Sequence, residues 1–420
     1  MFTTEATQYG ETPGPPAPES RGGFLLAVRE TLPGIIAGAA DLDPAAVLTA
    51  TVVGATFGLS IAWVVLISFP VLKTVFAVSS RIGRDTRRGL IELVRIRYGG
   101  GRAKAMALGM VVVNLAMVIG DIYAVSDAFS LILLQRRAMF IAVVGFVIWY
   151  FLIISDYKKV TKTLGSLTLV LLAYVLAAHR ATDSYLHLAR GVLLPHMQMT
   201  GAYFMAAIAL FGSLLTPDVI VWQTSTKRDL PQGVASAHYT ESNAGTIVAC
   251  LISFCVIICA SRLHVAAPGE MTTRSAAEAL NVLGHAGPVI FSLGIIGSGL
   301  VALPLIVGSL CFSIAEAFGW KSRLSRAPWE ATRFYTLISA VVVIAVTIDL
   351  FGINVVTVLY WSQLFAGILT IPILYYMRKL GNDPAIVNVR NSRGENGWLI
   401  GAMIVAIIAN LAFLGSQFVH

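Results

Sequence analysis

Two proline-containing breaks constrain this chain most, because each interrupts a long apolar segment beside a carboxylate. The first reads Asp41-Leu42-Asp43-Pro44 in the opening segment, and the second reads Thr216-Pro217-Asp218 near the middle of the chain. Hydrocarbon makes both an unpaired charge and a broken backbone costly. Two such breaks therefore indicate a substrate site around which a membrane transporter is built.

The composition agrees with a polytopic membrane protein. Only 12% of the 420 residues are charged and 57% are hydrophobic, which a soluble domain of this length would not show. The apolar windows are too long and too uniform for barrel strands, so we expect an all-α fold. Eleven spanning helices are predicted, near 31–57, 59–79, 105–134, 138–155, 162–178, 200–225, 243–263, 286–315, 331–350, 353–377 and 397–418.

The positions of the breaks predict an internal repeat. Each break lies in the first span of a set of five, one set covering about 31–178 and the other about 200–377. Five is odd, so the second set must enter the membrane from the opposite side, and the two form an inverted repeat. The helix at 397–418 is additional. We expect residues 1–23, rich in proline, to be a disordered tail before a single transmembrane domain at 24–420.

Positive charge alternates from loop to loop along the chain. Eight lysines and arginines lie between Arg81 and Lys104, after the second predicted span, and the alternate loops carry few. This pattern predicts a cytoplasmic N-terminus and an outside C-terminus in the plasma membrane, the inner membrane of a bacterium. The net charge of +8 is therefore explained by topology, and we expect no nucleic-acid partner.

The two aspartates beside the breaks indicate the sign of the substrate. Asp43 and Asp218 lie near the middle of their spans, with no lysine or arginine at that depth in the same span. An unpaired carboxylate costs several kcal/mol in low dielectric, so the pair requires a cation or protons. One alternative is that Lys73, in the second span, pairs with one of them. Another is that each proline only kinks its helix.

The donor atoms near the breaks are all oxygens. Thr216 and Ser213 accompany the two aspartates, and this set suits magnesium, calcium or manganese. Three cysteines share one predicted span, at Cys250, Cys255 and Cys259. Their spacing does not place all three on one helix face, which favours packing over a soft-metal site.

Three further polar residues have two interpretations each. Asp121, in the third span, is either part of a proton or secondary cation route or a capped structural carboxylate. Gln363, in the tenth span, either coordinates a cation or bridges two helices. Asp41 is a second acid close to Asp43 that, like Gln223, belongs to the possible proton or secondary cation route, but it points to another face unless the break redirects it.

Several segments resemble the natural resistance-associated macrophage protein (Nramp) family of divalent-metal transporters. The likeness is carried by the residues around Asp43-Pro44 and Thr216-Pro217, by Gly89-Leu90-Ile91-Glu92-Leu93, and by 292–300 and 315–320. The resemblance implies the LeuT-type fold, with two inverted five-helix repeats and with the first and sixth helices unwound at the metal site.

Departures from the family pattern fall on the metal site that the resemblance implies. The first-span motif Asp-Pro-Gly-Asn reads Asp43-Pro44-Ala45-Ala46, and the sixth-span motif Met-Pro-His reads Thr216-Pro217-Asp218. The resemblance also assigns a backbone-carbonyl ligand to Ser213 and a side-chain ligand to Gln363. The asparagine, thioether and imidazole are lost and a carboxylate is gained. This resembles the magnesium-transporting branch of the family.

The proton route of the family is also altered. The third-span acid pair reads Asp121 and Ala124, and the second histidine of the sixth span reads Gln223. Uniport driven by the membrane potential is therefore one expectation.

The sequence thus predicts a secondary transporter that moves a hard divalent cation, magnesium or manganese, by alternating access. The cation is the substrate, and no cofactor is expected. One alternative is a transporter of a small organic cation of the amine or guanidinium type. The other is a non-transporting ligand sensor, although no cytoplasmic output domain is visible. No nucleophile or histidine constellation lies at membrane depth, so we do not expect an enzyme. The sequence does not indicate an oligomeric state.

Overall fold

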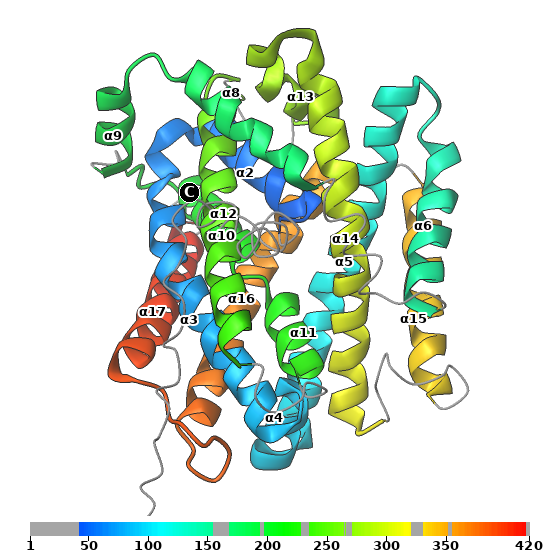
Figure 1. Ribbon diagram of the computed structural model, residues 1–420, viewed down its shortest axis with the longest axis vertical. Helices are drawn as coiled ribbons and strands as arrows, with labels where there is room; N and C mark the ends of the chain where they lie inside the picture. Colours follow the sequence, from blue (N-terminus) through cyan, green and yellow to red (C-terminus); the bar gives the residue numbers. More distant parts are fainter. Residues whose placement is uncertain are drawn as a thin grey trace, which may run out of the picture.

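The fold is a bundle of helices (Figure 1). The computed structural model describes residues 42–153, 168–193, 197–227, 235–263, 265, 271–320, 331–351 and 355–416, and every regular element in these ranges is helical. The predicted tail at 1–23 and the residue Asp41 lie outside the described residues. The first half of the chain contains α2 (Pro44–Phe57), η1 (Gly58–Ile61), α3 (Trp63–Thr86), α4 (Leu90–Tyr98), α5 (Gly100–Leu133), α6 (Ala138–Ile153), η2 (Leu169–Leu172), α8 (Ala173–Ala181) and α9 (Tyr185–Leu193).

The second half begins with a broken pair of helices and continues to the last long helix. Its elements are α10 (Gly201–Leu214), α11 (Pro217–Lys227), α12 (Ala235–Ala260), α13 (Thr273–Ala277), η4 (Glu278–Ala286), α14 (Gly287–Phe318), α15 (Thr332–Asp349), α16 (Val355–Gly381) and α17 (Arg393–Ser416). Among the described residues, eight helices are long and apolar enough to span a membrane. Three shorter apolar helices, at 138–153, 169–181 and 245–260, occupy the remaining predicted windows.

Two segments between the predicted spans contain helices of their own. Residues 179–199 include α9, and residues 264–285 include α13 and most of η4. Thr272 starts α13 with a capping box, in which its hydroxyl and that of Ser275 each accept a bond from the other's backbone N–H. These helices are too short to give a spanning-length apolar signal, so the hydropathy pattern did not reveal them.

The sequence interpretation assumed that the two prolines lie inside helices. The structure places both at helix starts. Pro44 is the first residue of α2 and Pro217 the first residue of α11. Proline is tolerated there because the N–H that it lacks has no intrahelical partner at that position. Each break therefore lies just before its proline, and each proline begins a new helix.

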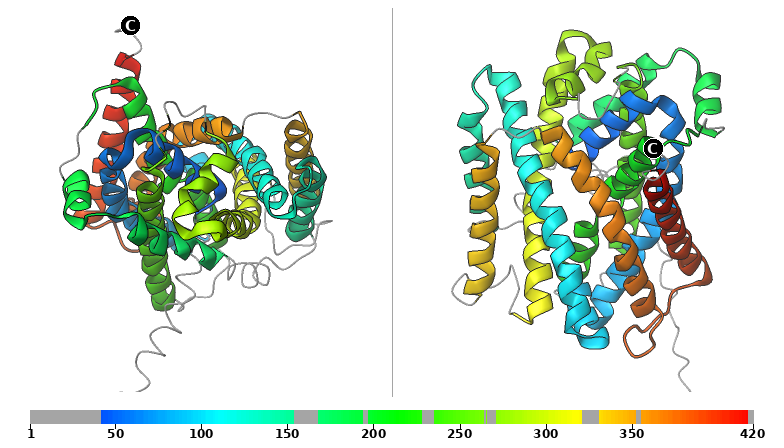
Figure 2. Two further views of the ribbon diagram at one scale, coloured as in Figure 1. Left: turned by 90° about the horizontal axis from the view of Figure 1, so that it is seen from above. Right: turned by 180° about the vertical axis from the view of Figure 1, so that it is seen from behind.

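The long helix α14 packs against both of these helices, α2 and α11. A Cβ on Gly299 would lie 3.1 Å from the Pro44 ring, and one on Gly308 would lie 2.5 Å from the Trp222 ring of α11. The small residues of α14 thus permit close helix packing. Helices α6 and α15 stand together at the edge of the bundle in both side views (Figures 1 and 2).

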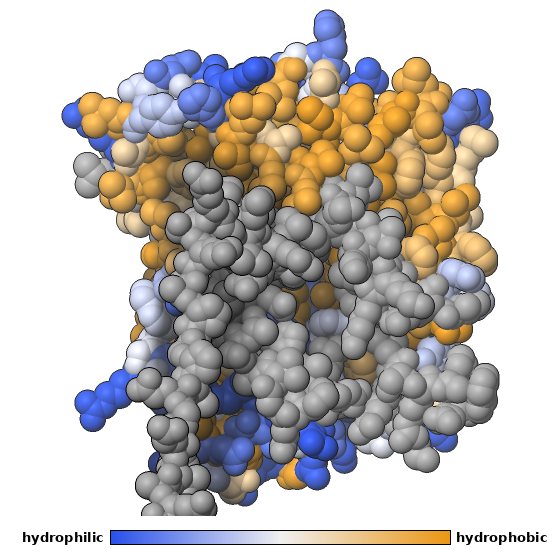
Figure 3. All heavy atoms as spheres, in the orientation of Figure 1, coloured by the Kyte–Doolittle hydropathy of each residue, from blue (hydrophilic) through white to orange (hydrophobic). Residues whose placement is uncertain are grey.

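The surface shows a broad apolar zone between polar ends (Figure 3). Large side chains on the outer faces of the helices are exposed, including Leu108 at 65% and Phe146 at 61%. Such exposure is costly in water but ordinary in contact with lipid tails. The bundle therefore has the surface of a membrane protein.

The packing of α10 against α16 gives a first testable expectation. A Cβ on Gly212 would lie 2.1 Å from the backbone oxygen of Gln363 and 2.5 Å from the backbone nitrogen of Gly367. Because backbone atoms cannot rotate away, we expect Gly212→Ala to destabilise the protein by about 1–3 kcal/mol. Thermal unfolding in detergent measures the effect. Gly401→Ala in α17 is the matched control, since a Cβ there meets nothing within 4 Å; an equal loss in both variants would contradict the close-packing explanation.

Candidate functional site

Asp43 is fixed by the helix that follows it. It is the N-cap of α2, with extended backbone, and its Oδ1 accepts a hydrogen bond from the Ala46 N–H at 2.6 Å. The side chain is 4% exposed. A carboxylate at this position is favoured by the N-terminal dipole of the helix. The Asp-Pro sequence thus places a charged oxygen pair at the buried start of α2.

Asp218 is the aspartate of the second break and directly follows Pro217. It belongs to the first turn of α11, is 2% exposed, and interacts with the Thr216 side chain and the Val219 N–H. Its Oδ1 is buried and has no hydrogen-bond partner among the described residues. One oxygen of Asp218 is therefore held by the break, while the other remains available to a ligand.

The break between α10 and α11 also provides backbone oxygens. Pro217 has no N–H to donate to the carbonyl of Ser213, four residues earlier. The next carbonyl after α10, that of Leu215, accepts a hydrogen bond from Thr370 Oγ1 of α16 at 3.0 Å. The proline thus leaves the Ser213 carbonyl without its usual helical partner, as a backbone ligand requires.

Asp121 joins these two aspartates. It is completely buried on α5 and interacts electrostatically with both Asp43 and Asp218. The Ala45 backbone N–H, at the start of α2, lies next to this carboxylate, although neither carboxylate oxygen makes a hydrogen bond of normal geometry within the described part of the chain. Three buried carboxylates from α2, α5 and α11 share one region.

Gln363, in α16, is the other residue that the sequence predicts as a side-chain ligand. Its side chain is fully buried, and both its Oε1 and Nε2 lack hydrogen-bond partners among the described residues. A buried amide without partners is costly, so a helix-bridging role does not account for it. The close approach of α10 at Gly212 puts Gln363 beside the first half of the broken helix.

Lys73 does not neutralise the aspartates, as one alternative supposed. Its side chain is exposed on the outer face of α3, while Leu72 and Thr74 beside it are buried. No described ion pair joins it to Asp43 or Asp218. The negative charge of the site is therefore not balanced by this lysine.

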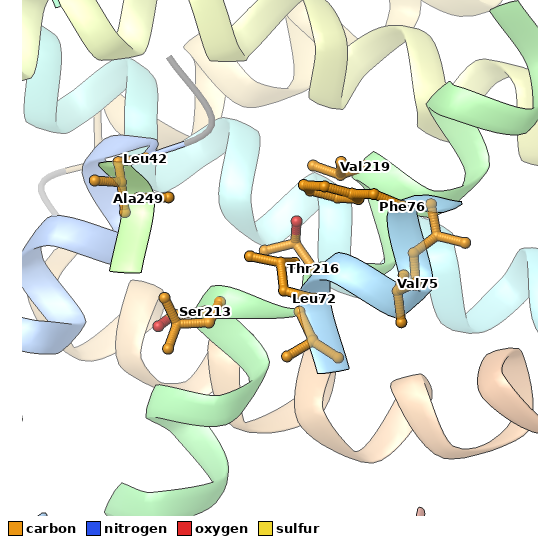
Figure 4. Close-up of a pocket in the computed structure, with 11 residues that line it drawn as sticks. Leu42, Leu72, Val75, Phe76, Ser213, Thr216, Val219 and Ala249 are labelled. Carbon is orange, nitrogen blue, oxygen red and sulfur yellow. The ribbon is translucent and has the colours of Figure 1, made fainter. Parts of the chain in front are cut away.

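The space at the second break is small. A cavity of about 10 Å³ lies between α3, the residues before α2, and the α10–α11 break. In Figure 4, Ser213 and Thr216 flank the break, with Leu72, Val75 and Phe76 on one side. That volume holds about one water molecule. Its lining does not include Asp43, Asp121 or Asp218, so the cavity lies beside the three carboxylates rather than around them.

The arrangement is not a preformed cluster of acidic ligands. Among the described residues, no group of three His, Cys, Asp or Glu side chains is close enough to hold one metal ion. Cations bound here would take oxygens of mixed type, from carboxylates, the break carbonyl and the Gln363 amide. The cysteines of α12 are buried in the core.

Below the break, α11 is tied to its neighbours by polar contacts that the sequence interpretation partly missed. Ser79 Oγ of α3 donates to Gln223 Oε1 at 2.9 Å. The Leu90 N–H at the start of α4 donates to Thr224 Oγ1 at 3.2 Å. Gln223 was expected on a proton or secondary cation route; the structure places it in a neutral hydrogen bond between α11 and α3.

Glu316 is the most connected residue of this layer. It is 2% exposed near the end of α14, where Oε1 accepts from Ser225 Oγ at 2.6 Å and Oε2 from the Glu92 N–H at 3.3 Å. A carboxylate at the N-terminus of α4 is stabilised by the exposed N–H groups of that helix. The sequence signal for Glu316 was a single acid at the end of an otherwise apolar segment.

The chain matches a family model and several solved structures. The model described as "Natural resistance-associated macrophage protein-like" matches residues 34–416. The manganese transporter of Eremococcus coleocola, solved with an aromatic bis-isothiourea substituted compound, is similar with a TM-score of 0.72 and 14% identity, covering 96% of this chain and 89% of that one. MhsT in complex with L-phenylalanine gives a TM-score of 0.60 at 14% identity, covering 91% and 98%.

A third match extends the likeness to another transporter class. Mhp1, a nucleobase-cation-symport-1 family transporter in a closed conformation, gives a TM-score of 0.50 at 13% identity, covering 93% of this chain and 92% of that one. These similarities confirm the predicted LeuT-type fold, with two inverted five-helix repeats and an additional helix.

Proposed function

The chain belongs to the natural resistance-associated macrophage protein family, and we propose that it moves a hard divalent cation, magnesium or manganese, across the plasma membrane by alternating access. The family consists of transporters, so the protein is a multi-pass membrane transporter and not an enzyme. The observation that supports the proposal is the burial of Asp43, Asp218 and Asp121 in one region, close enough for their charges to interact. Three carboxylates in low dielectric require positive charge.

The proposed ligands are oxygens from four helices. Asp43 and Asp218 supply the charge, and Thr216, the Ser213 carbonyl and Gln363 complete the shell. Hard cations prefer such a set, whereas the soft thioether typical of the family motif is replaced by Thr216.

The proposed driving force is the membrane potential. Two charges crossing a potential of about 100 mV gain roughly 4.6 kcal/mol, at about 2.3 kcal/mol each. The neutral hydrogen bond of Gln223 with Ser79 occupies the place where the family has a titratable histidine. Asp121 is then a secondary cation ligand, and transport does not require protons.

Purified protein in proteoliposomes tests the substrate class. We expect potential-driven uptake of magnesium or manganese, inhibited by neither amines nor guanidinium compounds. Uptake of an organic cation with no competition from divalent metals would favour the other transport hypothesis. Binding of a cation with no flux under any gradient would favour a sensor.

Proton movement gives a separate prediction. Because Gln223 cannot titrate, we expect metal uptake to proceed without internal acidification and to change less than about twofold between weakly acidic and neutral pH. A pH-sensitive dye enclosed in the liposomes measures this. Acidification in fixed ratio to metal uptake would show that Asp121 or another acid carries a proton.

A further inference from the structure

A second, larger cavity lies at the end of the molecule that we expect to face the cytoplasm. It has a volume of about 480 Å³ and lies between the end of α4, the end of α16 and the start of α17. These elements meet at the lower end of the bundle in the rear view (Figure 2). Sites for small molecules commonly measure about 300–1,000 Å³. The cavity is therefore large enough for a small-molecule ligand.

The lining of this cavity carries a net positive charge. Arg97, Arg378 and Lys379 are cationic, and Asp383 is the single acid. Asp383 already accepts from Arg97 Nε at 3.1 Å. Neither Arg378 nor Lys379 forms an ion pair within the described ranges. Two positive charges thus face the cavity without a described counter-charge.

Arg378 is half-buried and lines the cavity. Its Nε is enclosed by protein and has no hydrogen-bond partner among the described residues, whereas its terminal guanidinium nitrogens are not enclosed. The terminal N–H groups are therefore the donors that a ligand in the cavity would meet. The positive-inside rule explains arginines at this end of the protein, and the partly buried position of Arg378 holds its guanidinium at the cavity wall.

The walls around Arg378 are held in place by other contacts. Asn382 Nδ2 donates to Asn396 Oδ1 at 2.7 Å, and Asn396 Nδ2 returns a bond to Asn382 Oδ1 at 3.0 Å. This pair fixes the end of α16 against the start of α17. On the other wall, the Tyr98 ring lies 5.1 Å from that of Tyr376. Burial raises the pKa of Tyr98, so its hydroxyl remains a hydrogen-bond donor at neutral pH.

We propose that this cavity binds a phosphate-bearing anion. Arg378 offers a planar guanidinium suited to two phosphate oxygens, Lys379 adds a second positive charge, and the Tyr98 hydroxyl adds a neutral donor. The phosphate belongs either to the headgroup of an anionic lipid or to a soluble phosphate compound, and the two arms of the test distinguish these sources. Bound phosphate would connect α4 to α16, the helix that carries Gln363.

The soluble arm of the test uses inorganic phosphate with the full-length protein in detergent at constant ionic strength. We expect calorimetric binding and a raised unfolding temperature, with affinity reduced at least about tenfold by Arg378→Gln combined with Lys379→Gln. Arg84→Gln combined with Arg102→Gln is the matched control, because both arginines are exposed at the same end outside the cavity. The control should bind within about twofold of the unchanged protein.

The lipid arm uses nanodiscs of phosphatidylcholine with and without phosphatidylglycerol. Native mass spectrometry counts the phosphatidylglycerol molecules retained by each variant. Loss of retained lipid in the Arg378→Gln and Lys379→Gln variant alone identifies a headgroup, whereas loss of binding only in the soluble arm identifies a free phosphate compound. Arg378→Lys, which keeps the charge and the fold, should weaken binding by an intermediate amount.

Two outcomes would overturn the proposal. One is binding, in both arms, that the cavity variants leave unchanged. The other is an equal loss in the control variant, which would show a diffuse attraction of the whole basic surface. Because metal flux is not the readout, failure here leaves the proposed transport function untouched.

Discussion

Asp43→Asn is expected to abolish divalent-cation uptake while leaving the protein folded. The substitution removes one negative charge from a buried site, where a charge pair about 4 Å apart is worth roughly 4 kcal/mol at an effective dielectric constant near 20. Asparagine caps helices as well as aspartate does, so the bond from the Ala46 N–H to the side chain is retained. We expect flux to fall at least about a hundredfold with an unchanged unfolding temperature.

Asp43→Ala separates the two roles of this residue. It removes both the charge and the cap of α2, so we expect the same loss of flux together with about 1 kcal/mol less stability. Flux into proteoliposomes and thermal unfolding of the same preparations give both values. Normal transport by Asp43→Asn would remove this residue from the site, whatever the stability of Asp43→Ala.

Asp218→Asn is expected to have the second largest effect. The unpartnered Oδ1 of Asp218 is the oxygen that we assign to the cation, and replacing it with a neutral amide should lower cation affinity at least about tenfold. The measurement is calorimetric titration of magnesium and manganese. The interaction with Thr216 needs only one acceptor, which asparagine retains.

Asp349→Asn is the matched control for Asp218. Asp349 is also buried, at 1% exposed, and neither of its oxygens has a described hydrogen-bond partner. It lies at the end of α15, at the edge of the bundle (Figure 1). Cation affinity should stay within about twofold of the unchanged protein. Equal losses in Asp218→Asn and Asp349→Asn would mean that buried negative charge in general, rather than a local site, determines binding.

The breaks could be located from the sequence, but their geometry could not. Proline beside aspartate in an apolar segment indicated an interruption, and the broken helix between Leu214 and Pro217 confirms it. The sequence interpretation placed each proline in a helix interior, and this was wrong. Each proline is the first residue of a helix. The Asp43-Pro44 pair carried the missing signal, since an N-cap followed by proline is a helix start.

The composition of the site depended on contacts that a sequence does not encode locally. Asp121 reaches Asp43 and Asp218 only because α5 is rotated to present that residue to α2 and α11. Lys73 is excluded for the same reason, because it lies on the outer face of α3 although its neighbours Leu72 and Thr74 are buried. Helix rotation is set by packing along the whole bundle, so the sequence could name these residues but not place them.

The layer below the site was largely missed. Glu316 appeared only within a segment that resembles the family, yet it connects α14 to α11 and caps α4. Its partner Ser225, and Thr224 beside it, which accepts from the Leu90 N–H, gave no sequence signal, since single hydroxyl residues are common in apolar helices. The loop helices α9 and α13 were missed because they are short.

Magnesium uptake into proteoliposomes with an imposed inside-negative potential tests the central claim most directly. Unchanged protein and the Asp43→Asn and Asp218→Asn variants are compared, with manganese as the second cation and the pH held equal on both sides. The account predicts uptake of at least one of the two cations that rises with the potential, needs no proton gradient, and is lost in both variants. Uptake of neither cation by the unchanged protein, or full uptake by both variants, would contradict it.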